Sequence, residues 1–194
     1  AMLLSGVDNH LSGLGNMAEE LGPNQKGKPG YEGFLNDRVV SVARLLSDAG
    51  YRTMMAGKWH LGHSVELGPE SRGFKDTFVL PGGGNHFNDN RAIYIGGNTN
   101  VVSKVGYRQN GELVTLPDDY YSSAYFTDKL IEFLSGHHQR APDQPFFAFA
   151  SYHAPHWPLQ APEKFIERYK GVYDSGYDSI RKQRFSRIKE LGLI

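Results

Sequence analysis

Cysteine is absent from the 194 residues of this chain. Its absence excludes disulfide bonds, thiolate metal sites and cysteine nucleophiles. An excess of charge of one sign is missing too, because 21 Lys and Arg side chains balance 21 Asp and Glu side chains. A chain without net charge has no overall field to attract nucleic acid or an anionic membrane, although a local cationic site is compatible with this balance. We therefore expect no nucleic-acid partner.

Long apolar runs are also missing. No hydrophobic stretch approaches the roughly 20 residues that span a bilayer, and residues 1–6 lack the charged and apolar regions of a signal peptide. We therefore expect no membrane partner, while the compartment stays open. Hydrophobic side chains make up 39% of the sequence and charged ones 22%, which is enough apolar material for one globular core and gives no bias toward disorder.

Helix and strand signals alternate along the chain. Apolar residues recur at helical spacing between Asn36 and Gly50, where Asn36 suits the N-cap and Gly50 suits the C-terminal end. A strand is predicted from Tyr51 to Ala56, and a short one from Thr77 to Leu80. The nearly continuous apolar run from Phe146 to Ser151 is typical of a strand covered on both faces in a parallel sheet. This alternation predicts an α/β fold.

Residues 85–117 are predicted to form a loop insertion that lines the substrate pocket, with a small antiparallel hairpin turning at Asn110-Gly111. A second helix is predicted from Ser123 to Ser135. Gly136 is expected to end it, which leaves the two following histidines in solvent.

Two more helices are predicted near the C-terminus, from Glu163 to Tyr169 and from Asp178 to Leu191. The last of these is basic, but Phe185 is the one aromatic residue among its cationic side chains. We interpret it as a solvated helix face rather than a nucleic-acid surface.

Cationic and aromatic side chains gather at the end of the first predicted strand, where Lys58, Trp59 and His60 lie between glycines. If the backbone stays extended through His60, the two-residue period of a strand puts Lys58 and His60 on one face and Trp59 on the other. An ammonium beside an imidazole, whose reference pKa is roughly 6.5, suits an oxyanion ester. The spacing alone fits equally a surface lysine beside a histidine that bonds a carbonyl.

Zinc is the competing interpretation of the histidines. His60 and His63 are three residues apart, as are His153 and His156. However, a glycine interrupts the first pair, a proline interrupts the second, and no carboxylate precedes either at the usual spacing. We therefore predict no metal ligand in this chain. His63 and His86 are kept as candidates for a pocket, and His153 is assigned a structural role.

Two longer segments carry a family resemblance. Residues Gly50–Gly62 and His153–Pro162 resemble, in order and separation, two signature segments of the formylglycine-dependent (type I) sulfatases. The likeness runs through nearly the whole chain, and Asn16–Glu19 and Gly27–Gly33 are most similar to bacterial arylsulfatases. The resemblance implies an alkaline-phosphatase-like α/β/α sandwich with a mostly parallel sheet, here incomplete, with residues 1–194 forming part of an N-terminal catalytic domain.

The resemblance also implies a function and roles for three residues. Sulfatases of this type hydrolyse aryl sulfates or other sulfate esters with a formylglycine nucleophile and a calcium or magnesium ion. By motif, Lys58 resembles the lysine that bridges the sulfate and the formylglycine. His60 resembles the histidine bonded to the formylglycine hydroxyl, and His156 resembles the sulfate-binding histidine near the leaving oxygen. Lys58, His60 and His156 are thus the candidate catalytic residues, and Lys58 and His156 the candidate substrate ligands.

The chain departs from the family pattern in what it lacks. The Cys-x-Pro-x-Arg signature that yields formylglycine would precede Ala1, and the family's metal ligands would lie before Ala1 and after Ile194. We therefore expect this chain to bind no cofactor and to be inactive alone. Two alternatives stay open: a phosphatase or phosphodiesterase of the same superfamily, and a non-catalytic interaction piece that self-associates through an exposed sheet edge.

Overall fold

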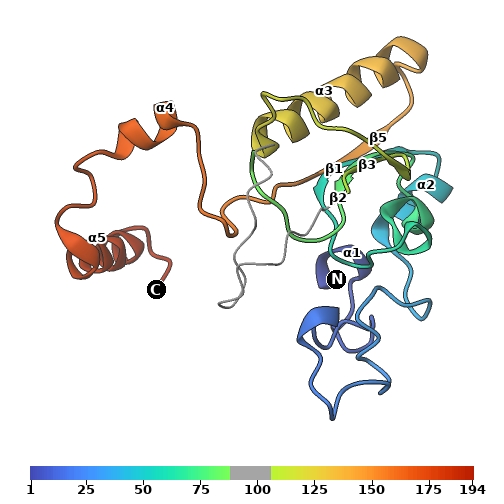
Figure 1. Cartoon of the computed structure of the whole chain (residues 1–194), viewed down its shortest axis with the longest axis horizontal. Coiled ribbons are helices and arrows are strands. Elements are labelled where there is room, and N and C mark those ends of the chain that lie inside the picture. The colour runs from blue at the N-terminus through green and yellow to red at the C-terminus, as the bar shows by residue number, and fades with distance from the viewer. Residues whose placement is uncertain (88–105) are drawn as a thin grey trace. The chain divides into compact units, whose positions relative to one another are not determined.

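The computed structural model of the chain describes residues 1–87 and 106–194 (Figure 1). They form two compact units, Ala1–Leu159 and Gln160–Ile194, which are described separately. Within the described residues, no helix combines the length and the apolar character that crossing a bilayer would require.

A five-stranded sheet forms the centre of the first unit. Three strands run parallel, β1 (Arg52–Lys58), β2 (Asp76–Leu80) and β5 (Phe146–Ser151), and two short antiparallel strands, β3 (Arg108–Gln109) and β4 (Glu112–Leu113), extend one side. The strand order is β4-β3-β2-β1-β5. The predicted α/β class with a mostly parallel sheet is confirmed.

Helices cover both faces of this sheet (Figure 1). The long helix α3 (Ser122–Arg140) packs on one face, and α1 (Met2–Ser5) and α2 (Val42–Asp48) contribute to the core on the other. Three short 3-10 helices, η1 (Ala18–Glu20), η2 (Val65–Leu67) and η3 (Pro69–Arg72), lie in the connections.

The two cores follow from the alternation of side chains along β1. Met54 and Ala56 point toward α3, where they join Phe126, whereas Met55 points to the opposite face and joins Ala43 of α2. All of these side chains are fully buried, and burying a Met or Phe side chain stabilises a fold by roughly 1.5–3 kcal/mol. The strand is therefore locked in register, because a slip of one residue would exchange the two faces.

The first predicted helix starts later than expected. Its N-cap is Ser41, whose hydroxyl accepts the Arg44 N–H at 3.1 Å. Asn36 is buried and engaged elsewhere, since its side chain donates to the Leu11 carbonyl at 3.1 Å and accepts the Arg38 N–H at 3.0 Å. Both residues have capping side chains, and the tertiary contact of Asn36 decides between them.

Helix α3 extends past Gly136 to Arg140, so the predicted end at that glycine was wrong. The last turn of α3 is basic, which complements the negative end of the helix dipole. His137 is buried and its Nε2 bonds the Gln144 carbonyl at 2.9 Å, so the expectation of a solvated side chain was also wrong for it. His138 is exposed, as expected.

Strand β5 was expected to be covered on both faces, but its residues are only partly buried and Phe146 is 51% exposed. Among residues 1–87 and 106–194, β5 pairs with β1 on one side and with no strand on the other. Such an edge offers unpaired backbone groups to another strand. Self-association through this edge stays a prediction.

The predicted hairpin at Asn110-Gly111 is confirmed. Asn110 has φ 50° and Gly111 has φ 86°, and two central residues with positive φ are characteristic of the type I′ turn that joins right-twisted strands. The hairpin extends the main sheet through the pairing of β3 with β2. Residues 88–105 of the predicted insertion lie outside the described residues.

The second unit contains α4 (Glu163–Ile166), η4 (Glu167–Tyr169) and α5 (Gly176–Glu190), close to the two predicted C-terminal helices. None of these elements contains a buried residue.

The tight pairing of β1 with β5 at Gly57 generates a stability prediction. Gly57 has φ 129°, and a Cβ there would collide with the Ser151 carbonyl, whereas Gly50 has φ 91° with nothing near its missing Cβ. Gly50→Ala should lower the free energy of unfolding by about 1–2 kcal/mol through backbone strain alone. Gly57→Ala should cost more than about 3 kcal/mol, because strain and collision combine. Urea denaturation followed by circular dichroism measures both, and equal losses would contradict the close approach.

Candidate functional site

Strand β1 ends at Lys58, so the Lys58 side chain lies at the carboxyl end of the strand. Beyond Lys58 the backbone stays hydrogen-bonded to the end of β2 and to the residue after it. The Trp59 N–H donates to the Leu80 carbonyl at 2.9 Å, and the His60 N–H donates to the Pro81 carbonyl at 3.0 Å. His60 has φ 51°, a left-handed conformation that is uncommon outside glycine. The condition under which Lys58 and His60 would share one strand face, an extended backbone through His60, is therefore not met.

Trp59 anchors this turn in the core. Its indole is buried, donates to the Leu67 carbonyl at 2.9 Å and packs edge-on against Phe74 with 6.2 Å between ring centroids. On the other side, the Ser151 hydroxyl of β5 donates to the Lys58 carbonyl at 2.7 Å. The backbone is thus fixed while the Lys58 and His60 side chains are only half-buried.

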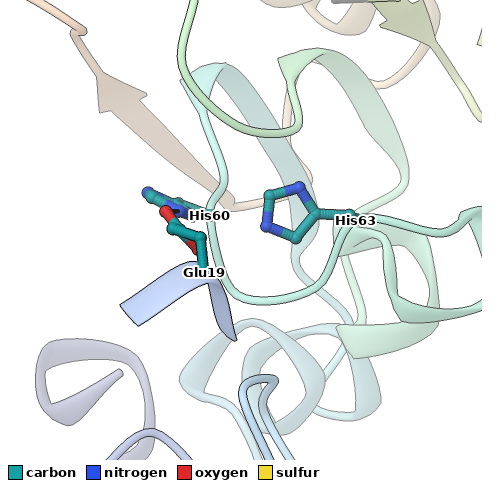
Figure 2. A group of neighbouring side chains, drawn as sticks. All are labelled: Glu19, His60 and His63. Atoms are coloured by element: carbon teal, nitrogen blue, oxygen red, sulfur yellow. Dashed lines mark hydrogen bonds and ion pairs between the residues drawn. The ribbon is translucent and has the colours of Figure 1, made fainter. Parts of the chain in front are cut away.

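The turn brings His60 against a carboxylate from a distant part of the chain (Figure 2). His60 Nε2 lies 2.7 Å from Glu19 Oε1, and Glu19 belongs to η1. The His63 ring stands edge-on to the His60 ring at a centroid distance of 5.3 Å. Glu19 carried no predicted role, because a separation of 41 residues leaves no spacing signal.

The electrostatic balance of this group favours a neutral imidazole beside an anion and a cation. Burial, and then the charge of Lys58, lower the pKa of His60 despite the nearby Glu19. Burial also lowers the pKa of Lys58, while Glu19 opposes that change. For Glu19, burial works toward a higher pKa, but its backbone hydrogen bond and His60 outweigh it and the pKa is lowered. Because a carboxylate only accepts, His60 Nε2 carries the proton and Nδ1 keeps a lone pair.

A second group of histidines combines His153 and His156, which follow β5, with His86, which follows β2. The His86, His153 and His156 rings stack in that order, with centroid distances of 4.6 Å and 5.1 Å. His86 is buried between the Ser122 hydroxyl, 2.8 Å from Nδ1, and the His156 carbonyl, 3.1 Å from Nε2. His156 is exposed, and its Nδ1 lies 2.8 Å from the Trp157 carbonyl, so Nε2 holds the lone pair of the neutral ring.

His153 is the middle ring of this stack. It is 3% exposed, and neither of its ring nitrogens has a hydrogen-bond partner in the described part of the chain. Burial lowers its pKa to about 3, with further contributions from the charges of His86, Lys58, His156 and His60. Lys58 and His60, predicted from one segment, and His156, predicted from another, therefore all lie close enough to this buried neutral imidazole to influence its pKa.

Comparison with known proteins identifies the family. A family model described as Sulfatase matches residues 1–191. An uncharacterized sulfatase of Schizosaccharomyces pombe is 44% identical over 213 aligned residues, which cover 100% of this chain and 35% of that protein. The arylsulfatase of Klebsiella aerogenes is 43% identical over 195 residues, covering 100% of this chain and 40% of that enzyme. The chain thus spans two fifths or less of the length of these relatives.

The fold is shared with solved structures as well. The crystal structure of Ps i-CgsB matches with a TM-score of 0.69 at 22% identity, over 89% of this chain and 37% of that one. This likeness, together with the three-layer arrangement, confirms the predicted alkaline-phosphatase-like α/β sandwich, of which this chain forms a part.

The neutral state of His153 predicts a pH dependence of stability. Between about pH 6.5, where an unfolded histidine titrates, and its native pKa of about 3, the unfolded chain holds a proton that the native chain does not. His153 therefore makes stability fall on acidification, by up to about 1.4 kcal/mol per pH unit. His153→Phe, which keeps a stacking ring without a titrating group, should give a shallower loss than wild type.

Urea unfolding at a series of pH values from about 7 to about 4.5 measures this slope. His138→Gln, at an exposed position of α3, serves as the matched control and should keep the wild-type slope. A wild-type slope in His153→Phe would show that His153 titrates normally.

Proposed function

The chain belongs to the sulfatase family, and from that premise we propose that it supplies the anion-binding and proton-handling part of a site that hydrolyses sulfate esters. The observation that carries this proposal is that the Lys58 cation and the hydrogen-bonded pair of neutral His60 and anionic Glu19 lie at the carboxyl end of β1. The carboxyl ends of parallel strands are where open α/β sheets place their ligands.

Lys58 binds the sulfate group of the substrate in this proposal. Hydrogen bonds from β5 and to the end of β2 fix the backbone at Lys58. The site therefore needs little structural reorganisation when negative charge develops on the sulfuryl oxygens. Partial burial strengthens the attraction, because less water competes with the anion.

His60 accepts and returns a proton in this proposal, and Glu19 positions the His60 ring. His60 Nδ1 can take a proton from an attacking or bound hydroxyl. The Nε2–H meanwhile keeps its hydrogen bond to the Glu19 carboxylate, whose negative charge stabilises the resulting imidazolium. Lys58 opposes that charge, so the proton is returned readily. Glu19 is thus a positioning residue whose role follows from geometry and not from a motif.

His156 faces the alcohol side of the ester. It is exposed, and the Trp157 carbonyl fixes its ring through Nδ1, so Nε2, once protonated, can donate a hydrogen bond to the leaving oxygen. We assign an aryl sulfate or a related sulfate ester as the small-molecule partner.

Formylglycine and a calcium or magnesium ion are the groups that the family implies, and the residues present do not fit them. The sequence contains neither a Cys-x-Pro-x-Arg segment nor its serine equivalent to convert. Calcium takes 6–8 oxygen ligands and magnesium prefers an octahedron of oxygens, whereas Glu19 is grouped with two imidazoles. The proposal therefore assigns no step of the reaction to either group.

Sulfate binding is the first test. Titration of the protein with 4-nitrophenyl sulfate, followed by nuclear magnetic resonance, should show binding that Lys58→Gln weakens by at least about tenfold, or about 1.4 kcal/mol. Lys75→Gln removes an exposed lysine next to β2 and should leave binding unchanged. Equal affinity in the two variants would refute the role of Lys58. Stronger, Lys58-dependent binding of 4-nitrophenyl phosphate would favour the phosphatase alternative.

Turnover is the second test. We expect the purified 194-residue chain to hydrolyse 4-nitrophenyl sulfate no faster than its Lys58→Ala variant, with calcium present, because it has no nucleophile of the family type. Release of 4-nitrophenol measured by absorbance decides the point. Turnover that depends on Lys58 would mean that another side chain acts as the nucleophile.

A further inference from the structure

Glu19, His60 and His63 offer three metal-ligating atoms in one small volume. These atoms all lie within 4.8 Å of one another, and no other group of three or more His, Asp or Glu side chains meets this condition in residues 1–87 and 106–194. Figure 2 shows the Glu19 carboxylate against His60, with the His63 ring beside them.

We propose that Glu19, His60 and His63 form a binding site for a divalent transition metal ion of the zinc type. The inference rests on the proposed function in one respect, which is that the ion would occupy the histidine assigned to proton transfer. The site would therefore be regulatory, because His60 cannot ligate a metal and handle a proton at the same time.

The ligand set selects the class of ion. Two imidazole nitrogens and one carboxylate oxygen are a recurrent zinc combination that leaves a fourth position for water. Calcium and magnesium prefer oxygen ligands and are disfavoured by two nitrogens.

The local backbone removes the objections that the sequence raised. Chelation by two histidines three residues apart needs a helix when it is inferred from spacing, and Gly62 argues against one. In the structure no helix is needed, since His60 with φ 51° and Gly62 with φ 145° form a turn that brings the His63 ring beside that of His60. The missing carboxylate comes from η1, as Glu19.

The distances require only small side-chain movements. Tetrahedral coordination with metal–nitrogen bonds of about 2.0–2.1 Å separates neighbouring ligand atoms by about 3.3 Å. The Glu19 Oε1 and His60 Nε2 atoms, now 2.7 Å apart, must move slightly apart. The His63 ligand nitrogen, which lies within 4.8 Å of the other ligand atoms, must move toward them. Glu19 and His63 are exposed, so both can rotate without disturbing the core.

The charges of the group also suit a cation. The Glu19 carboxylate can offset part of the charge of the ion, and each of the two imidazoles can offer a nitrogen lone pair. Metal binding at His60 Nε2 needs only a shift of the ring proton to Nδ1. Lys58 opposes the ion, which favours reversible binding over a permanent structural metal.

The test titrates the protein with cobalt(II) chloride, whose visible absorption reports tetrahedral coordination, and then displaces the cobalt with zinc chloride. Wild type should bind one ion at this site. Glu19→Gln and His63→Leu should each weaken binding by at least about tenfold, since each removes a ligand. His138→Leu, which removes an exposed histidine of α3, should bind as wild type does.

Three results would overturn the proposal: His63→Leu binding cobalt as tightly as wild type, His138→Leu weakening it equally, or excess calcium chloride displacing the ion. His63 is exposed, so an unchanged urea midpoint of His63→Leu shows that lost binding is not lost folding. The titration contains no sulfate ester. A failed metal site and a failed sulfate site are therefore distinguished, because the latter is measured by the Lys58→Gln comparison alone.

Discussion

Where β1 ends, hydrogen bonds hold the backbone from both sides. The Ser151 hydroxyl donates to the Lys58 carbonyl from β5, and the Trp59 and His60 amides donate to carbonyls at the end of β2. Within this clamp His60 adopts a left-handed conformation that non-glycine residues rarely take. The conformation turns the His60 ring toward Glu19 while Lys58 stays at the strand end. The chemistry of the site thus depends on how three parallel strands pair.

Burial and charge then set the protonation of the site. Lys58 is a cation, Glu19 is an anion, and His60 between them is neutral because burial and Lys58 outweigh the carboxylate. His153 is neutral because burial lowers its pKa, and its ring stacks between those of His86 and His156. A neutral imidazole with one nitrogen bonded to a carboxylate can accept a proton or a metal ion, so the proposed proton transfer and the proposed metal site compete for the same His60 ring.

Local patterns in the sequence were sufficient for the parallel strands and for the position of Lys58 at a strand end, because apolar runs and a glycine-flanked strand end are short-range signals. They failed where tertiary contacts decide. Asn36 and Ser41 are both capping residue types, and only the contact of Asn36 with Leu11 assigns the cap to Ser41. Glu19 has no signal near His60 in the sequence, and the positive φ of His60 has no residue-type signature. Each miss depends on residues that are distant in sequence.

The central claim, that His60 is a neutral imidazole bonded through Nε2 to Glu19, is tested most directly by a nitrogen-15 correlation spectrum of the histidine rings near neutral pH. We predict that His60 shows one protonated nitrogen, Nε2, and an unprotonated Nδ1. A doubly protonated ring, or a proton on Nδ1 alone, would contradict the account, because Glu19 could then not be the acceptor that orients a neutral base.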